Sequence, residues 1–238
     1  MKRVLLSPAY VLHRRAYRET SLLIDLFTPD HGRLSVIAKG VRKPRSTQAS
    51  LLQPFVPLLV SWTGKTELLT LMHVEMNGGC QSLRGECLFA GFYLNELLVA
   101  LLQKWDPHPE VYTLFEQTLV KLNDPTLPQG ALRTFEKQLL EALGYGFFPP
   151  TALLSDTFVV DQYYRFIPEE GFVKNENNLN DGAATFLGKS LIGIAKEAWH
   201  EGAVLHDAKR LIRLVLAPLL GNKRLHSRRL FTQPTHAN

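Results

Sequence analysis

Cysteine is scarce in this sequence, which contains only Cys80 and Cys87 among its 238 residues. Two cysteines are too few for a disulfide framework and fall two short of a four-cysteine zinc site. The eight histidines are scattered along the chain and form no His-Glu-x-x-His motif. We therefore expect neither redox chemistry nor a bound metal.

Long apolar runs are also lacking. The stretches at residues 51–61 and 211–220 are interrupted by proline or by a charged residue. Both are shorter than the roughly 20 residues that cross a bilayer. Residues 1–15 begin like a signal peptide, but their apolar run is short and no small-residue cleavage site follows. The sequence predicts a cytoplasmic protein that does not cross a membrane.

Motifs for catalysis are missing as well. Gly188, Lys189 and Ser190 resemble the end of a phosphate-binding P-loop, which requires a further glycine separated from Gly188 by four residues. Ala183 occupies that position, and Gly182 lies one place too early. Because no nucleophile elbow or carboxylate pair stands out either, we expect no catalytic residues, no enzymatic activity and no cofactor.

What the sequence does have is basic charge at both of its ends. Residues 1–78 carry 11 Lys and Arg against 5 Asp and Glu, and residues 205–238 carry 7 against 1. The segment between them is acidic, with 9 basic against 16 acidic residues. Two basic ends favour binding of a polyanion, because phosphate contacts release counterions. A solvated basic surface without a ligand is the alternative.

The N-terminal part has the pattern of a small β-barrel. Short runs of β-branched and aromatic residues, separated by turn signals, predict strands at residues 9–17, 21–28, 33–39, 55–62 and 67–76. Turn residues at 28–32 and 63–65 predict hairpins between the second and third strands and between the fourth and fifth. Five strands with a longer connection after the third match an OB-fold, which commonly binds nucleic acid. An SH3-like barrel is the alternative.

The chain after residue 78 has helical periodicity, so we place a domain boundary between 1–78 and 79–238. Helices are predicted at residues 85–103, 109–122, 128–143, 184–200 and 208–220. Residues 147–183 are predicted to be a small irregular insertion, with a possible hairpin through 157–167. Residues 222–238 form a basic and then polar tail. The predicted fold class is thus α+β, with an OB-fold barrel followed by an all-helical domain.

Basic residues cluster at two places in the predicted barrel. One group lies on the first strand and the loop after it, and the other follows the third strand; they comprise Arg14, Arg15, Arg18, Lys39, Arg42, Lys43 and Arg45. The two groups could converge on one DNA-binding groove. For the second group, a flexible solvated loop is the alternative. Tyr17, Phe27 and Trp62 could stack on bases, although burial in the barrel core is the favoured interpretation.

Several segments, taken in order, resemble bacterial RecO proteins, a family of recombination mediators. They are AYVLHRRAYRETSLL at 9–23, GRLSVIAKGVRK at 32–43, LQPF at 52–55, YLNELL at 93–98, LRTFE at 132–136, LGYG at 143–146, LGNK at 220–223 and SRRLF at 227–231. Each segment is weakly specific alone, but their shared order covers nearly the whole chain. The resemblance implies an OB-fold followed by a helical domain.

The resemblance also implies a function. Proteins of this family bind single- and double-stranded DNA, anneal strands coated by single-stranded-DNA-binding protein, and work with RecR to load RecA, without ATP or a cofactor. This implies DNA repair and recombination in the cytoplasm, in association with the nucleoid. Some relatives carry a four-cysteine zinc module at about 144–173, but no cysteine is present there and zinc is not carried over.

Relatives also bind the acidic, Phe-terminated tail of single-stranded-DNA-binding protein on the helical domain. An apolar slot and several cations suit such a tail. The residues expected to supply them are Leu132, Arg133, Phe135, Leu139, Lys209, Arg210 and Arg213. The alternative for the apolar members is an ordinary core position. A different function is also open, that of an adaptor which mainly binds this tail and has only incidental DNA affinity.

Overall fold

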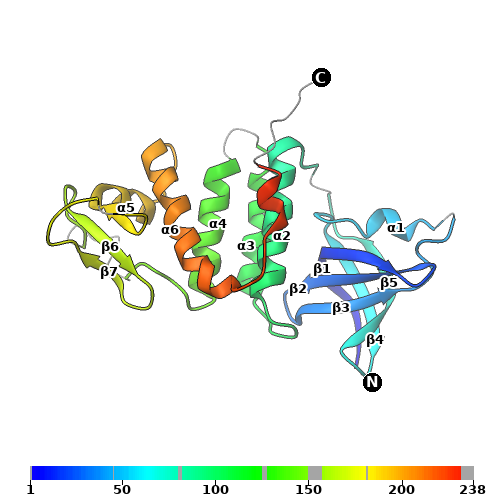
Figure 1. The fold of residues 1–238 in the computed structure, drawn as a ribbon. Helices are drawn as coiled ribbons and strands as arrows, with labels where there is room; N and C mark the ends of the chain where they lie inside the picture. The colour runs from blue at the N-terminus through cyan, green and yellow to red at the C-terminus, as the bar shows by residue number, and fades with distance from the viewer. Residues whose placement is uncertain are drawn as a thin grey trace. The chain divides into compact units, whose positions relative to one another are not determined.

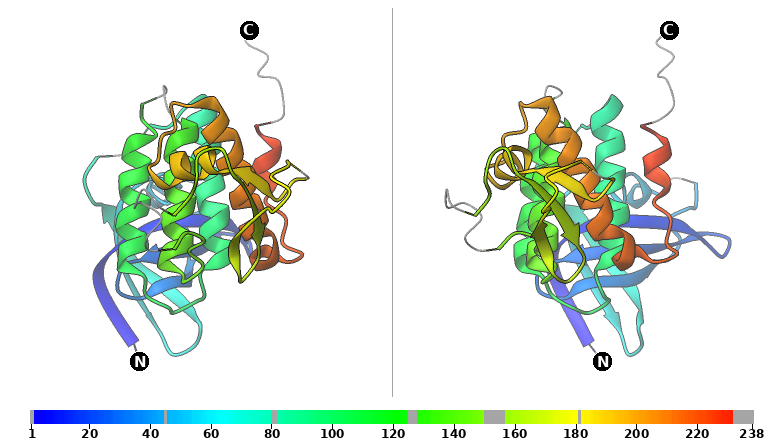
Figure 2. Two further views of the ribbon diagram at one scale, coloured as in Figure 1. Left: turned by 90° about the vertical axis from the view of Figure 1, so that its left-hand side faces the viewer. Right: turned by 60° about the vertical axis from the view of Figure 1, so that its left-hand side comes forward.

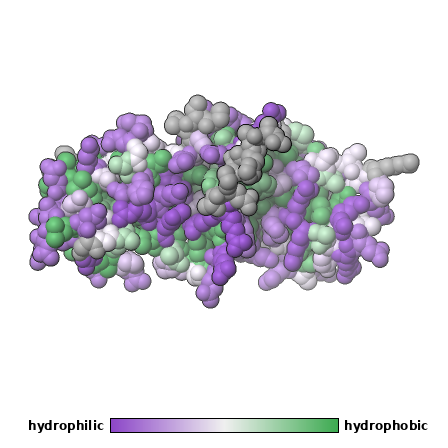
Figure 3. Space-filling model, turned by 45° about the horizontal axis from the view of Figure 1, so that its top comes forward, coloured by the Kyte–Doolittle hydropathy of each residue, from purple (hydrophilic) through white to green (hydrophobic). Residues whose placement is uncertain are grey.

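The computed structural model describes residues 2–44, 46–79, 82–124, 128–149, 157–180 and 182–231 (Figure 1). The chain forms two compact units. Unit 1 consists of Met1–Pro125 together with Arg224–Asn238, and unit 2 consists of Thr126–Lys223. Hydrophilic residues are spread over both units on the face shown in Figure 3, with small hydrophobic areas between them. Among the described residues, no helix is long and apolar enough to span a bilayer.

Five strands of unit 1 form a closed barrel. They are β1 (Lys2–Tyr17), β2 (Ser21–Thr28), β3 (Gly32–Ala38), β4 (Leu58–Gly64) and β5 (Leu68–Met76). Their order is β1-β2-β3-β5-β4, with β1 also paired to β4 and only the β3–β5 pair parallel. The short helix α1 (Gln48–Leu51) lies in the connection from β3 to β4. The predicted OB-fold and both predicted hairpins are therefore confirmed.

Two strand ends differ from the prediction by three residues or more. β1 begins at Lys2 rather than at residue 9, because its first half pairs with β4 and only its second half pairs with β2. β4 begins at Leu58 rather than at residue 55. Pro54 and Pro57 lack a backbone N–H and cannot donate to a ladder, so the segment that contains them does not extend the strand.

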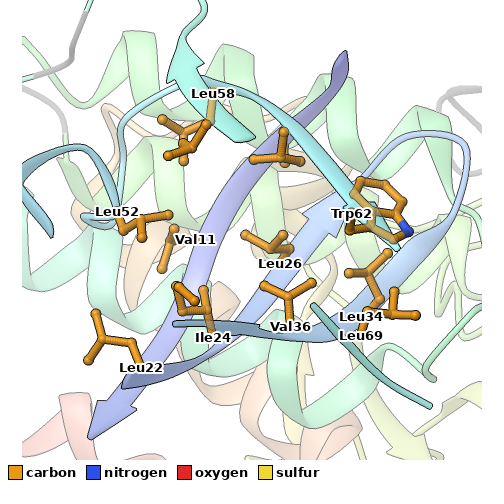
Figure 4. Close-up of a cluster of buried hydrophobic side chains, with 14 of the residues drawn as sticks. Val11, Leu22, Ile24, Leu26, Leu34, Val36, Leu52, Leu58, Trp62 and Leu69 are labelled. Carbon is orange, nitrogen blue, oxygen red and sulfur yellow. The ribbon is translucent and has the colours of Figure 1, made fainter. Parts of the chain in front are cut away.

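The barrel interior is a continuous hydrophobic core. Alternate residues of each strand point inward, as Ile24 and Leu26 of β2 and Leu34 and Val36 of β3 do (Figure 4). Trp62 lies among these side chains and is 1% exposed. The favoured interpretation of this tryptophan as a core residue is confirmed, because its ring has no surface on which a base could stack.

Helices α2 (Gly85–Leu101) and α3 (Pro109–Lys121) pack on the barrel. Asn95 of α2 donates from Nδ2 to the backbone oxygens of Val11 (3.3 Å) and Leu12 (2.9 Å). Phe27 is fully buried and, with Tyr10, contacts the rings of two aromatic residues of α3. These contacts keep α2 and α3 in the same compact unit as the barrel. The barrel thus ends near residue 78, while compact unit 1 continues through α2 and α3.

Unit 2 contains helices and a small sheet. Its helices are α4 (Pro128–Ala142), α5 (Gly188–Ala195) and α6 (Gly202–Leu220), and its strands are β6 (Tyr163–Ile167), β7 (Gly171–Lys174) and β8 (Thr185–Leu187). The three strands form an antiparallel sheet in the order β7-β6-β8. α6 packs against both α4 and α5.

This sheet corrects the prediction of an irregular insertion in an all-helical domain. Its stability has a clear source, since Phe158, Phe166 and Phe172 form ring contacts with centroid separations of 5.2–5.4 Å. The predicted helix at 184–200 is also wrong in its first part, because Thr185–Leu187 pairs with β6 as β8 before α5 begins. The helices predicted at 128–143 and 208–220 are present, although α6 begins earlier than expected.

Gly32 generates a prediction about stability. It has φ +63°, and a Cβ atom built on it would lie 2.1 Å from the backbone oxygen of Asp106. Gly32→Ala therefore forces both an unfavourable backbone conformation and a displacement of the α2–α3 connection. We expect the free energy of unfolding in urea to fall by about 2–4 kcal/mol. Gly79→Ala is the control, because no atom lies within 4 Å of its Cβ position. Equal stability of the two variants would contradict the prediction.

The tyrosines of the aromatic cluster generate a prediction about pH. Burial, and next the Glu116 carboxylate, raise the pKa of Tyr10 and Tyr112 well above the ordinary value of about 10. The unfolded chain therefore loses these protons first as the pH rises, so stability is complete below pH 10 and falls above it. The expected slope is about 1.4 kcal/mol per pH unit for each tyrosine. Tyr112→Phe should remove the contribution of one tyrosine to the pH dependence of the free energy of unfolding, measured in urea between pH 9 and 11. Tyr145→Phe, at an exposed position, is the control and should leave this pH dependence unchanged.

Candidate nucleic-acid interface

The basic groove is a depression on the barrel between the β1–β2 turn and the loop after β3. It has a volume of about 880 Å³. Its lining comprises Tyr17, Arg18, Glu19, Thr20, Ser21, Ile37, Lys39, Gly40, Lys43 and Thr70. The structure thus brings Arg18 of the first predicted basic group together with Lys39 and Lys43 of the second. Lys39 and Lys43 are exposed, as is Arg18.

Local pairing explains why these residues meet. Leu22 of β2 lies opposite Ala38 of β3, so the turn before β2 and the loop after β3 emerge at the same end of the barrel. Arg42 then joins the two segments: its backbone N–H donates to Thr20 (2.9 Å), and its Nη1 donates to the backbone oxygen of Arg18 (3.2 Å). Arg42 therefore holds the loop in place, a role that the sequence did not reveal.

The charge of the basic groove suits a phosphate backbone. Arg18, Lys39 and Lys43 line it with a single acidic residue, Glu19, among the described lining positions. Arg15 is exposed on β1 and lies two residues from Tyr17, so both side chains are on the same face of the strand. The half-buried Tyr17 contributes a ring to the groove, and the Arg18 guanidinium lies 5.3 Å from its centroid. Of the three aromatic residues considered for stacking, only Tyr17 lies in the groove.

Of the predicted DNA-binding residues that the structure describes, Arg14, Arg15 and Arg42 are not among those that line the groove. Arg14 is half-buried and donates from Nη1 to the backbone oxygens of Leu52 (3.1 Å) and Ala49 (3.5 Å). It lines a different pocket, between β1 and α2. Arg45 lies outside the described residues.

The residues predicted to bind an acidic tail lie in unit 2, and most of them have structural partners. Leu132, Phe135 and Leu139 are buried core residues of α4, so the apolar slot expected from them has no exposed surface. Arg133 is buried as well and forms an ion pair with Glu136 at 3.0 Å. The structure thus shows the alternative arrangement, in which Leu132, Phe135 and Leu139 are core residues.

The three predicted cations of α6 differ in their exposure to solvent. Arg210 forms a 2.6 Å ion pair with Asp207, donates to the backbone oxygens of Ala183 and Thr185 at the start of β8, and packs over a ring of β8. It therefore holds the small sheet against α6. Lys209 and Arg213 are exposed and four residues apart, so they lie on one face of the helix. These two remain the accessible members of the predicted set.

The described residues contain no group of three or more His, Cys, Asp or Glu side chains that could hold a metal ion. Cys87 is a buried free thiol, and burial is the main cause that raises its pKa. Cys80 lies outside the part of the chain that the structure describes.

Comparison with known proteins gives a consistent picture. Residues 1–79 match the family model described as Recombination protein O N terminal, and residues 84–147 match Recombination protein O C terminal. A DNA repair protein RecO of Coxiella burnetii (strain RSA 493 / Nine Mile phase I) is 42% identical over 230 residues, covering 96% of this chain and 98% of that protein. A DNA repair protein RecO of Pseudoalteromonas atlantica is 43% identical over 228 residues, covering 95% and 93%.

The basic groove generates a prediction about DNA affinity. Lys39→Glu combined with Lys43→Glu should weaken binding of a single-stranded oligonucleotide, because two cations are replaced by anions. The slope of log affinity against log salt should become shallower by about 1.4, since each lost phosphate contact removes roughly 0.7 for single strands. Fluorescence anisotropy at several salt concentrations measures both. Lys65→Glu is the matched control, because Lys65 is exposed and does not line the groove. Unchanged affinity of the double variant would remove the groove from the DNA-binding surface.

Proposed function

Because the chain belongs to the RecO family of DNA repair and recombination proteins, we propose that it is a non-enzymatic mediator that anneals single strands. Its substrates are complementary strands coated by single-stranded-DNA-binding protein, and it helps RecR to load RecA. The observation that carries the proposal is the basic groove, in which turn and loop cations meet on the outer surface of an OB-fold barrel.

The mechanism that we propose is charge neutralisation. Two DNA strands repel each other through their phosphates, and each strand has a condensed layer of counterions. Cations fixed on a folded surface replace these counterions and hold the strands at short distance. Base pairing then supplies the specificity, so the protein does not need to read the sequence. No bond is made or broken by a side chain, and this chemistry requires neither ATP nor a metal ion.

A second surface would recruit the coated strand. We propose that Lys209 and Arg213 on α6 attract the acidic tail of single-stranded-DNA-binding protein, since both are exposed on one helix face. Unit 2 also has a cavity lined by aromatic residues, including Phe148 and Phe172. Glu169 and Glu170 line the same cavity. Those carboxylates would repel an acidic tail, so the α6 face is the better candidate.

The test is annealing of complementary oligonucleotides coated with the cognate single-stranded-DNA-binding protein, without ATP. We expect the chain to accelerate annealing, and we expect the acceleration to decline with rising salt and after deletion of the acidic tail. Lys209→Glu with Arg213→Glu should reduce acceleration on coated strands and leave annealing of bare strands unchanged. Lys196→Glu, at an exposed position at the end of α5, is the control for surface charge.

The same assay separates the mediator from an adaptor. An adaptor would bind the acidic tail with the affinity of the intact protein and yet fail to accelerate annealing of coated or bare strands. That result, obtained with folded protein, would overturn the annealing function.

A further inference from the structure

The aromatic cavity is a space of about 710 Å³ in unit 2, between the β6–β7 turn, the segment after α4 and one face of α6. The small sheet and α6 lie side by side in Figures 1 and 2. We propose that this cavity and the neighbouring edge of β7 bind an extended, basic segment of a partner protein, which adds a strand to the sheet and places an apolar side chain in the cavity. This site goes beyond the proposed DNA binding, because it lies in unit 2 and uses no residue of the basic groove.

Aromatic rings and aliphatic side chains form the walls of the aromatic cavity. Phe148 and Phe172 stack with a centroid separation of 5.5 Å, and the buried Phe158 contacts both rings. Leu214 and Leu219 of α6 also line the cavity. Phe148, Phe172 and these two leucines are only half-buried, so the walls keep apolar surface in contact with water. A bulky apolar side chain that fills the cavity removes this surface from water, which is favourable.

β7 has backbone hydrogen-bonding groups at an edge of the sheet. In the order β7-β6-β8, it is paired with one strand only. Phe166 of β6, which lies opposite Phe172, donates its backbone N–H to Ala184 on the β8 side (2.8 Å). The Phe166–Phe172 pair is therefore a non-hydrogen-bonded position of the antiparallel ladder, as is the position of Lys174 two residues later. The N–H and C=O groups of Phe172 and Lys174 point to the open edge, where a further strand can pair with them.

The open edge and the cavity meet at Phe172. The ring of Phe172 lines the cavity, so its face of the sheet is the face on the cavity side. In a strand added beside β7, the residue opposite Phe172 has its side chain on this same face. The same residue exchanges both backbone hydrogen bonds with Phe172. Strand pairing therefore directs one side chain of the partner, the anchor, into the cavity.

The charges at the two ends of β7 select the chemistry of the added strand. Glu169 and Glu170 are exposed and line the cavity at the turn before β7, and none of the described lining residues is basic. Lys174 is exposed at the other end of the strand. In antiparallel pairing, the C-terminal side of the partner segment lies beside the Glu169–Glu170 turn. A Lys or Arg two residues after the anchor is on the cavity face and meets these carboxylates.

This site is separate from the cations of α6 that we propose for an acidic tail. At about 100° per residue, the residues of α6 that line the cavity lie within an arc of about 140°. Lys209 and Arg213 lie outside that arc. The two faces of α6 thus suit ligands of opposite charge.

The test uses two fluorescein-labelled peptides, STVTLTKTS and STVTLTETS, which differ only in the charge two residues after the leucine anchor. We expect fluorescence anisotropy with the intact chain to give about three- to tenfold tighter binding of the lysine peptide, the range for one or two exposed charge pairs. Glu169→Lys with Glu170→Lys should abolish or reverse this preference. Glu201→Lys is the matched control, because Glu201 is exposed in the same unit and does not line the cavity.

Methylation of the peptide backbone tests strand addition without altering the protein. The leucine N–H of the peptide is expected to donate to Phe172, whereas the N–H of the following threonine points away from β7. Methylation of the leucine nitrogen should weaken binding of the lysine peptide about five- to tenfold, the range for one hydrogen bond. Methylation of the threonine nitrogen should change it by less than about twofold.

Tighter binding of the glutamate peptide would assign the cavity to an acidic ligand and overturn the inference. An equal effect of the two methylations, or a charge preference that survives in the Glu169→Lys, Glu170→Lys variant, would overturn it as well. So would the absence of binding by either peptide at concentrations up to about 1 mM. The annealing assay tests the proposed function separately, since the basic groove and the aromatic cavity share no residue. Loss of annealing with intact peptide binding would overturn the proposed function alone.

Discussion

The interruption of the ladder in the middle of β1 is the constraint on which unit 1 depends. The register between β1 and β2 shifts between Val11 and His13, so the strand bulges there. A bulge leaves backbone groups without a ladder partner, and these must find one elsewhere. The Val11 and Leu12 oxygens find it in the Asn95 amide. The bulge therefore determines where α2 attaches, and α2 forms one wall of the pocket that Arg14 lines.

Most of the barrel could be predicted because its strands follow simple alternation and its turns contain the residues that turns require. Ser21–Thr28 and Gly32–Ala38 are clear cases, with alternate residues fully buried. The first half of β1 could not be predicted in this way. Leu5 and Leu6 are exposed, and Pro8 follows them, so this half lacks the pattern of a half-buried strand. It is a strand because β4 pairs with it, and long-range pairing is invisible in local periodicity.

The sheet of unit 2 was missed for a related reason. β6, β7 and β8 are short, and the last runs directly into α5 with only Gly188 at the junction, so residues 184–200 have the periodicity of one helix. The aromatic residues were visible in the sequence, but their contacts with one another were not. Arg210 also depends on this sheet, since its partners are backbone oxygens near β8. A helix pattern alone could not distinguish this structural cation from its exposed neighbours.

In the candidate sites, too, the sequence predicted contacts between adjacent strands but not contacts between segments that are far apart in the chain. Clustered charge correctly indicated that Arg18, Lys39 and Lys43 would meet, because adjacent strands determine their positions. Arg14 belongs to the same cluster of basic residues in the sequence. Its guanidinium, however, donates to backbone oxygens of the α1 region, and Arg14 lines another pocket. Asn95 and Glu96 did give a usable signal: two polar residues interrupt an otherwise strongly apolar helix. Such residues usually have a specific partner, here the β1 backbone and the C-terminal segment.

Glu96 of α2 accepts hydrogen bonds from the backbone N–H groups of His226 (3.1 Å) and Ser227 (2.8 Å), and the segment around η1 (His226–Arg229) lies beside α2 (Figures 1 and 2). The chain leaves unit 1 after Pro125 and enters it again at Arg224, so unit 2 is an insertion with both of its ends joined to unit 1. An inserted unit is joined to its neighbour by two chain crossings, whereas a unit joined end to end has one. The C-terminal residues that Glu96 binds thus belong structurally to the barrel from which the chain began.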